Sequence, residues 1–393
     1  MKKLLNIFLI FSICFVITGC DNTELKRKTT NTLEVKEESS YDYKFSMITF
    51  GDALIHPAVY NDAKRNSSTY NFKKMFTEVE KIISDYDLKF YNQETVIGGA
   101  SLGVSGYPTF NSPDAIGNDL IATGFNVVNL ASNHTMDKGS VGATYSANFW
   151  KNKEGVYAIG SYTNSTERNN IVIKEMNGIT YAILSYAYGT NGLPVPGGKE
   201  YLINLYSDAK AKQDIEKIRD KVDVLMVSMH WGTEYVLEPT SEQKREANYL
   251  ASLGVDVIIG HHPHVLQPME KRTITLDDGS TKDGFVIYSL GNFMSGQKAD
   301  NSRQSVILDI KLTKAGKDGK ISIDSVTYTP IYMYNYYTSK SAHRFKVMDI
   351  EAEIAKYEAG DTKIGATMYN TLKKELQGVY KVVGDEILPE KKE

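Results

Sequence analysis

Six apolar segments of this chain are each followed by a carboxylate, an amide or an imidazole. Near-continuous apolar runs of about four to eight residues are typical of strands that are covered on both faces. Helix-like segments lie between several of them and end at glycine, the residue most often found just after a helix. The pattern predicts an α/β fold in which helices cover a sheet. The expected strands are 44–50, 88–91, 125–130, 222–229, 255–259 and 285–290.

Two of the expected helices carry capping signals. Ser112 stands before a proline and an aspartate, which predicts a helix that begins with a serine cap and a proline in its first turn. Thr240 has Gln243 three residues later, the spacing of a capping box. A further amphipathic helix is expected over 72–84.

The residues that follow the six strands supply oxygen and nitrogen ligands. In covered α/β sheets, ligands bind outside the carboxyl ends of the strands, so these side chains are expected to converge. A single histidine there is more often a structural residue, but six of the seven histidines fall in these segments. This clustering favours a metal or catalytic centre over a role in capping strands alone. The main candidates are Asp52, Glu94, Asn133, His134, Asp137, His230, His262 and His264, and further candidates are His56, Asn92, Glu234, His261 and Asn292.

The donor types indicate which ions the site would bind. Carboxylates, amides and imidazoles without a thiolate suit divalent metals of borderline hardness such as Mn, Fe or Zn. Two such ions, about 3.5–4 Å apart, would activate water for attack on a phosphoryl or similar centre. His262 and His264 are spaced so that one extended loop could serve both ions. Asn133 offers a neutral oxygen beside His134, which Asp137 could orient.

The beginning of the chain has the features of a bacterial lipoprotein signal. A short basic start precedes the apolar run 4–16, which is too short to span a membrane. Small residues then precede Cys20, as at the site where bacterial lipoproteins are lipidated and cut. An ordinary signal peptide or an uncleaved anchor is the alternative. We predict a signal peptide over 1–19, lipidation at Cys20 and a flexible tether over 20–44, which would hold the protein on the extracytoplasmic face of the cell membrane.

Charge and cysteine content exclude two classes of protein. The formal net charge of −3 argues against non-specific nucleic-acid binding, because neutralising phosphates requires a basic face. Removal of residues 1–19 would take away two lysines and bring the net charge to −5. Two cysteines cannot build a disulfide framework, and Cys14 would leave with the signal.

The strand-end segments all lie within residues 45–300, which we expect to form one domain. After residue 301 the pattern changes. Strands are expected at 305–312 and 321–334, followed by a charged helical stretch after Phe345. Residues 301–393 could pack on the core as an extra layer or form an appended unit that docks a partner, and the sequence is compatible with both.

Seven strings of residues, taken in order, resemble one bacterial family. They are FGDALIH, NQET, YPTFNSPDAI, GFNVVNLASNHTMDKG, HWGTEY, GVDVIIGHHPHVLQPME and YSLGNF, and the resemblance that they carry spans roughly residues 45–293. The chain is similar to the CapA capsule-synthesis family (the PGA_cap domain), which is associated with poly-γ-glutamate. That family looks like a divergent branch of the calcineurin-like metallophosphoesterases. The resemblance implies a four-layer α-β-β-α sandwich of the metallophosphoesterase type.

The resemblance also implies roles for single residues. Asp52 would be the first metal carboxylate, Glu94 would stand where a bridging acid sits, and His134 would protonate a leaving group. The chain departs from the phosphoesterase pattern at two positions, because Leu54 stands where a histidine is usual and a glutamate replaces the bridging aspartate. By the same resemblance, one metal would be held by Asn133, His230 and His262, and the other by His264.

Two hypotheses of function follow. The first is a membrane-anchored, metal-dependent hydrolase that acts on a phosphoester or an envelope-polymer bond outside the cytoplasm. The second is a non-catalytic polymer-binding or scaffold component of a capsule synthesis or export complex, with membrane-bound polymerase or export proteins as partners. Poly-γ-glutamate is a polyanion, so binding it to a protein of net charge near −5 would require a local basic patch or bridging metal ions.

Overall fold

The computed structural model of the protein describes residues 42–275, 279–317, 319–337 and 343–384. The expected signal peptide, the lipidation site at Cys20 and most of the tether lie outside the described residues. The described residues form one compact unit. Among the described helices, none combines the length and the hydrophobicity that a membrane span requires.

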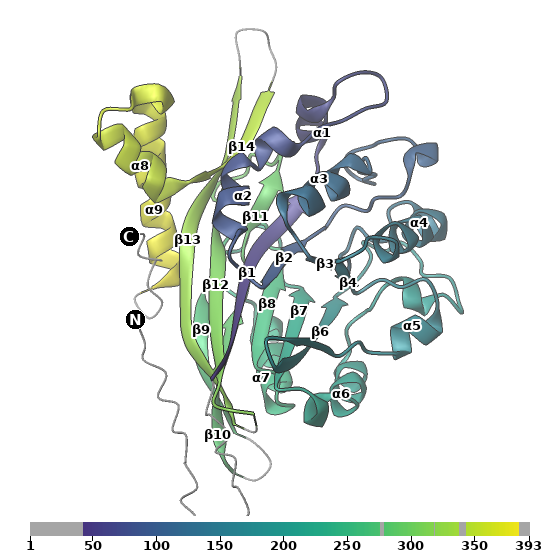
Figure 1. Ribbon diagram of the computed structural model, residues 1–393. Coiled ribbons are helices and arrows are strands. Elements are labelled where there is room, and N and C mark those ends of the chain that lie inside the picture. Colours follow the sequence, from purple (N-terminus) through teal and green to yellow (C-terminus); the bar gives the residue numbers. More distant parts are fainter. Residues whose placement is uncertain (1–41, 276–278, 318, 338–342, 385–393) are drawn as a thin grey trace, which may run out of the picture. The chain divides into compact units, whose positions relative to one another are not determined.

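Two β-sheets formed by the described residues stand at the centre of the fold (Figure 1). The first runs in the order β14 (His343–Asp349), β13 (Ile321–Tyr337), β12 (Gln304–Lys314), β1 (Tyr43–Leu54), β2 (Leu88–Asn92), β3 (Val127–Asn129) and β4 (Tyr157–Ile159), and β11 (Asn292–Ser295) also pairs with β1. The second runs in the order β5 (Lys174–Met176), β6 (Ile179–Ala187), β7 (Val224–His230), β8 (Val257–His261), β10 (Thr281–Ile287) and β9 (Met269–Thr275). In each sheet four neighbouring strands are parallel, namely β1 to β4 and β6-β7-β8-β10.

The two sheets pack face to face over a large apolar core. Met47 and Phe90 of the first sheet and Met226 and Ile259 of the second are fully buried in it. The outer face of the first sheet is covered by α1 (Pro57–Ala63), α2 (Thr77–Ile83), α3 (Ala115–Thr123) and α4 (Gly139–Lys151). The outer face of the second is covered by α6 (Asp208–Glu216) and α7 (Ser241–Ser252), and α5 (Ser165–Asn169) is a short helix before β5. The layers therefore run helix, sheet, sheet, helix, and the predicted four-layer fold class is confirmed.

The local signals in the sequence have mixed outcomes. The capping box of α7 is confirmed, because the Thr240 hydroxyl accepts a hydrogen bond from the Gln243 N–H at 3.1 Å and the Gln243 side chain accepts one from the Thr240 N–H at 2.9 Å. The prediction that Ser112 caps α3 is wrong. The Ser112 hydroxyl lies 2.7 Å from that of Thr95, and the backbone N–H of Ser112 donates to the Val96 carbonyl at 2.9 Å, so both groups bond to the neighbouring loop and not to the helix. The helix begins three residues later, at Ala115.

The helix expected over 72–84 is interrupted. A short 3₁₀ turn at Lys73–Met75 precedes α2, and Phe76 separates them with φ at −114°. Phe76 is fully buried against the first sheet, so packing of its side chain takes precedence over continuous helical backbone. The other short 3₁₀ turns lie at Ala100–Leu102, Glu200–Leu202, Arg219–Lys221 and Thr362–Ile364.

The strands after residue 301 extend the first sheet. β12 pairs with β1 in antiparallel register from Tyr43 opposite Lys314 to Thr49 opposite Leu308. The helices α8 (Ile350–Glu358) and α9 (Gly365–Val383) lie beside β13 in Figure 1. Val379 of α9 is buried in the core between the sheets. The described part of 301–393 therefore shares the sheet that carries Asp52.

Candidate metal centre

The carboxyl ends of the parallel strands of the two sheets meet at one place. Asp52 in β1 and Asn92 in β2 come from the first sheet, and His230 in β7 and His261 in β8 come from the second. The Asn92 amide donates to Asp52 Oδ1 at 2.8 Å and lies 3.5 Å from His230 Nδ1. His261 Nδ1 lies 3.4 Å from Asp52 Oδ1. All four side chains are buried, so polar groups of both sheets are in contact inside the protein.

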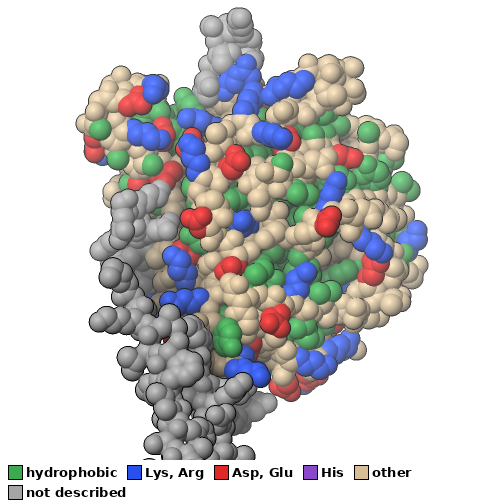
Figure 2. All heavy atoms as spheres, viewed as in Figure 1, with side chains coloured by type: hydrophobic (Ala, Val, Ile, Leu, Met, Phe, Trp, Pro, Cys, Tyr) green, Lys and Arg blue, Asp and Glu red, His purple; other side chains and the backbone are tan. Residues whose placement is uncertain are grey.

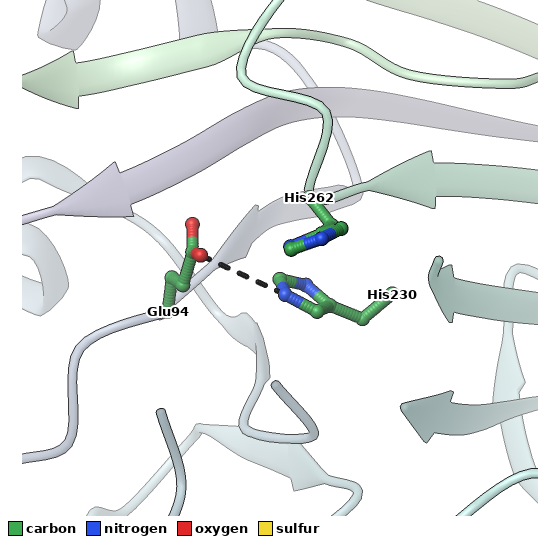
Figure 3. Close-up of side chains that lie close together, drawn as sticks. All are labelled: Glu94, His230 and His262. Atoms are coloured by element: carbon green, nitrogen blue, oxygen red, sulfur yellow. Dashed lines mark ion pairs between the residues drawn. The ribbon is translucent and has the colours of Figure 1, made fainter. Parts of the chain in front are cut away.

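Glu94 lies at the centre of this group. It follows β2 and is fully buried. Its Oε1 atom is 3.6 Å from His230 Nε2 and 3.4 Å from His264 Nε2. Figure 3 shows Glu94, His230 and His262 pointing toward one another from three separate parts of the chain. The carboxylate therefore reaches one histidine at the end of β7 and another just after β8.

Three sets of side chains in the described residues could each hold a metal ion, with their ligand atoms within 4.8 Å of one another. Glu94 belongs to two of the sets, and His262 and His264 also belong to two each. A carboxylate shared by two sets is the arrangement that a two-ion centre requires. The sets are Glu94, His230 and His262; Asp52, Glu94 and His264; and Glu234, His262 and His264.

The residues present fit divalent ions. Both oxygens of Glu94, both ring nitrogens of His261 and Nδ1 of His262 are buried without a hydrogen-bond partner among the described residues. An unpaired buried charge is costly, and a bound cation removes that cost. His262 and His264 have φ values of +97° and +58°, a region that non-glycine residues rarely adopt. Such strain is found where the surrounding structure fixes a functional side chain.

Burial and neighbouring charges shift the pKa values of these groups in different directions. Burial alone would raise the pKa of Asp52, but contacts with His261 and His264 hold it well below its usual range. Burial raises the pKa of Glu94 well above its usual range. Burial alone would lower the pKa of His264, but Glu94 and Asp52 raise it to about 9. Burial lowers the pKa of His262 to about 3, with His264 as the next cause. Without metal, the ionised Asp52 thus lies beside a protonated His264, whereas His262 is neutral, the state in which imidazole binds metals.

His134 and Asp137 form a second pair beside the cluster. His134 Nδ1 lies 2.8 Å from Asp137 Oδ2, and that oxygen also accepts the backbone N–H of Phe110 at 2.7 Å. The Phe110 ring packs edge-on against the imidazole, with ring centroids 4.8 Å apart. Because Nδ1 faces the carboxylate, Nε2 is the nitrogen that can meet a bound molecule. Within the described chain, His134 belongs to none of the three ligand sets.

The predicted amides hold the histidines in place. Asn133 Oδ1 lies 2.9 Å from His230 Nε2. Asn292 Oδ1 lies 3.2 Å from His264 Nδ1, and the Asn292 amide nitrogen donates to the carbonyl of the same histidine at 3.2 Å. The structure thus places Asn133 against a ligand set and Asn292 behind His264.

His56 and His261 lie outside the three ligand sets of the described residues. His56 Nδ1 accepts the Gly296 N–H at 3.2 Å, and burial lowers the pKa of this imidazole to about 4. The His261 ring stacks on Phe90, with centroids 5.7 Å apart, and its Nδ1 faces Asp52. Both histidines therefore border the site without facing its shared carboxylate.

Sequence reasoning missed several residues of the site. The Tyr188 ring lies 4.7 Å from that of His262, and Asn129 donates to the Asn92 side chain at 2.8 Å. Asn191 accepts a hydrogen bond from Asn133 at 3.2 Å. Tyr188 and Asn191 follow β6, an apolar strand that was not predicted. Applying the strand-end rule to residues 179–187 would have found Tyr188.

Several solved structures are similar to part of this chain. A phosphatase from Mycoplasma pneumoniae matches with a TM-score of 0.43 and 16% identity, over 74% of this chain and 94% of that one. The calcineurin-like phosphoesterase YfkN from Bacillus subtilis matches with a TM-score of 0.41 and 16% identity, over 87% of this chain and 99% of that one.

Sequence relatives are found among capsule proteins. The capsule biosynthesis protein CapA of Bacillus anthracis is 32% identical over 202 residues, which cover 49% of this chain and 46% of the relative. The PGA biosynthesis protein CapA of Bacillus subtilis (strain 168) is 32% identical over 203 residues, with 49% and 48% covered. The chain thus spans about half the length of these relatives. The family described as bacterial capsule synthesis protein PGA_cap matches residues 46–297, which include every candidate residue of the metal centre. Because this match extends over more than half of the chain, the protein belongs to the PGA_cap family, as its sequence motifs predict.

Proposed function

We propose that this protein is a metal-dependent hydrolase of capsule synthesis, anchored to the cell membrane and acting on its extracytoplasmic side. The observation that carries the proposal is a buried Glu94 shared by two ligand sets, one with His230 and one with Asp52. Membership of the PGA_cap family supports the link to capsule synthesis. The two CapA relatives support it further. A phosphoester or another bond of an envelope polymer is the substrate class that two ions would serve best.

The residues of the site have separate tasks in this proposal. Asp52 and His264 would hold one ion, and His230 and His262 the other, with Glu94 between them. Divalent ions bound there would supply Lewis-acid activation of water and of the bond to be cleaved. His134 donates a proton from Nε2 to the leaving group. The Asp137 carboxylate bonds to Nδ1 of the same ring and so orients the imidazole.

The catalytic part of the proposal is tested on the full chain purified in detergent. We expect bound Mn or Zn, and hydrolysis of a phosphodiester or a γ-glutamyl substrate. His134→Ala should retain its metal but lose about 10²- to 10⁴-fold in turnover, because it removes a proton donor without removing a ligand. Asp137→Asn should also retain metal and lose part of the rate. A preparation that binds no metal and turns over neither substrate after Mn or Zn addition would refute the proposal.

The membrane anchor is tested separately. Cys20→Ser should move the protein from the membrane fraction to the soluble or secreted fraction and abolish labelling by a clickable fatty acid, because the variant has no thiol at that position to carry lipid. Cys14→Ser is the matched control and should leave both unchanged. Equal labelling of the wild type and Cys20→Ser would contradict lipidation at this residue.

A non-catalytic role in a capsule synthesis or export complex is the second candidate. Leu54 favours it, because this buried side chain offers no ligand near Asp52. Against polymer binding, Figure 2 shows Lys and Arg interspersed with Asp and Glu on the face in view, not a continuous basic surface. Capsule output distinguishes the two roles. Output unchanged by His134→Ala and by His262→Ala supports the scaffold, and output lost with normal protein levels supports catalysis.

A further inference from the structure

Glu234 is an acidic residue at the solvent edge of the metal cluster. It lies in the loop after β7 and is exposed, whereas the other candidate ligands are buried. Its carboxylate lies within 4.8 Å of ligand atoms of His262 and His264. These two histidines belong to different sets that share Glu94. One side chain on the solvent side thus reaches a ligand of each ion position.

The backbone holds this loop against the histidines. The N–H of Trp231 donates to the carbonyl of His261 at 3.1 Å, and the N–H of Tyr235 donates to the carbonyl of Pro263 at 2.8 Å. Tyr235 has a φ of +64°, so the residue after Glu234 is held in a conformation that is rare for a bulky side chain. The backbone on both sides of Glu234 is therefore bonded to residues that flank His262, one at the end of β8 and one in the following loop.

A second observation within the same set indicates a ligand. His262 is 97% buried, and its Nδ1 atom has no hydrogen-bond partner among the described residues. An unpartnered buried nitrogen is costly unless a ligand satisfies it. Glu238, four residues further along the same exposed loop, belongs to none of the ligand sets of the described chain. Glu234 and Glu238 are thus both exposed acids of this loop, but only Glu234 lies near the two histidines.

We propose that Glu234 is a metal ligand that closes the two-ion cluster from the solvent side, opposite the buried Glu94. The inference rests on the metal centre of the proposed function and adds a ligand to it. An exposed carboxylate exchanges readily with water or with an anionic substrate group, because solvent can replace it at little cost. Glu234 would therefore retain the ions in the resting protein and give way when a substrate enters.

Metal binding by the full chain in detergent tests this inference without an activity assay. The protein is stripped with EDTA and titrated with Mn²⁺ by calorimetry, as wild type, Glu234→Gln and Glu238→Gln. Glu234→Gln should weaken Mn²⁺ binding by roughly tenfold or more, since even changes behind the ligands cost about 10- to 100-fold in metal affinity. Glu238→Gln should titrate as the wild type. The visible spectrum of the Co²⁺-loaded protein should differ from that of the wild type in Glu234→Gln and not in Glu238→Gln.

The outcomes separate this inference from the proposed function. Wild-type protein that binds no Mn²⁺ overturns both. If the wild-type protein binds Mn²⁺ and the Glu234→Gln variant has the same isotherm and the same Co²⁺ spectrum, only the role of Glu234 is overturned. Thermal unfolding of the metal-free proteins serves as the folding control, and the exposed Glu234→Gln change should leave it unaltered.

Discussion

At the scale of single residues, Glu94 combines two conflicting requirements. Its carboxylate is fully buried and without a hydrogen-bond partner among the described residues, so it destabilises the metal-free fold when ionised. Burial accordingly raises its pKa well above the usual range. The same carboxylate is the one that two ion positions share. Stability without metal and affinity for metal should therefore respond in opposite directions to a change at this residue.

Glu94→Gln tests this conflict. The metal-free variant should unfold at the same temperature as the metal-free wild type or higher, because a neutral amide is less costly to bury than a carboxylate. Added Mn²⁺ at about 100 times its dissociation constant should stabilise the wild type by about 2.7 kcal/mol and the variant far less. Thermal unfolding with and without Mn²⁺ measures both effects, with Glu238→Gln as the control. An equal Mn²⁺ response in wild type and variant would show that Glu94 is not a ligand.

Sequence alone predicted that polar side chains would meet, because parallel strands end at one edge of a sheet. Asp52, Glu94 and His230 lie together for this reason. It also ranked His262 above its neighbour His261, and His262 is the one that shares a ligand set with Glu94. His261 is the last residue of β8 and stacks on Phe90, whereas His262 begins the turn and faces Glu94. One step along a strand reverses the face of a side chain, and the position where the strand ends depends on tertiary packing.

At the scale of elements, the two capping signals had opposite outcomes: the one at Thr240 was confirmed, and the one at Ser112 was wrong. The capping box of α7 is local, and it is present as predicted. The residues of β14 after Phe345 were expected to belong to a charged helical stretch. This segment is a strand instead, because Phe345 and Val347 are buried in the core under the helices of the first sheet, with the partly exposed Lys346 between them. β6 was not predicted, and with it Tyr188 was missed.

Helix α7 carries a glutamate whose ionisation should make stability depend on pH. The Glu246 side chain is 12% exposed, and burial, followed by the charge of Glu242, raises its pKa to about 7. The folded protein therefore retains a proton at Glu246 that the unfolded chain has released between about pH 4.5 and pH 7. Stability from this residue is complete below pH 4.5 and is lost as the pH rises through 7.

Glu246→Gln should remove this dependence. Its unfolding free energy should match that of the wild type near pH 4 and exceed it by about 1 kcal/mol near pH 8, a figure reduced for the solvent that still reaches the carboxyl group. Urea unfolding at the two pH values measures the difference. The exposed Glu154→Gln, on the turn after α4, is the control and should show no such change. A gain that is as large at pH 4 as at pH 8 would assign the effect to packing rather than to charge.

At the scale of the whole molecule, the described part of residues 301–393 belongs to the core and not to an appendage. β12 covers one edge of β1 along seven consecutive residue pairs, and β1 carries Asp52 at its other end. Val306, Leu308 and Ile310 of β12 are buried between the two sheets. The strand that holds the metal carboxylate is thus fixed by a segment that comes some 260 to 270 residues later in the chain, a contact that no local pattern predicts.

A chain cut after residue 300 should therefore fail to fold, although it retains every candidate ligand. The cut removes three buried aliphatic side chains worth about 1.5–3 kcal/mol each from β12 alone, against a typical net stability of about 5–15 kcal/mol. It also exposes the edge of β1, which favours aggregation. Expression of this chain should give insoluble protein, whereas a control chain that ends at Gly384 keeps all described contacts and should be soluble and bind Mn²⁺. A soluble, cooperatively unfolding product of the first cut would show instead that 45–300 is a domain by itself and that the later strands were added to it.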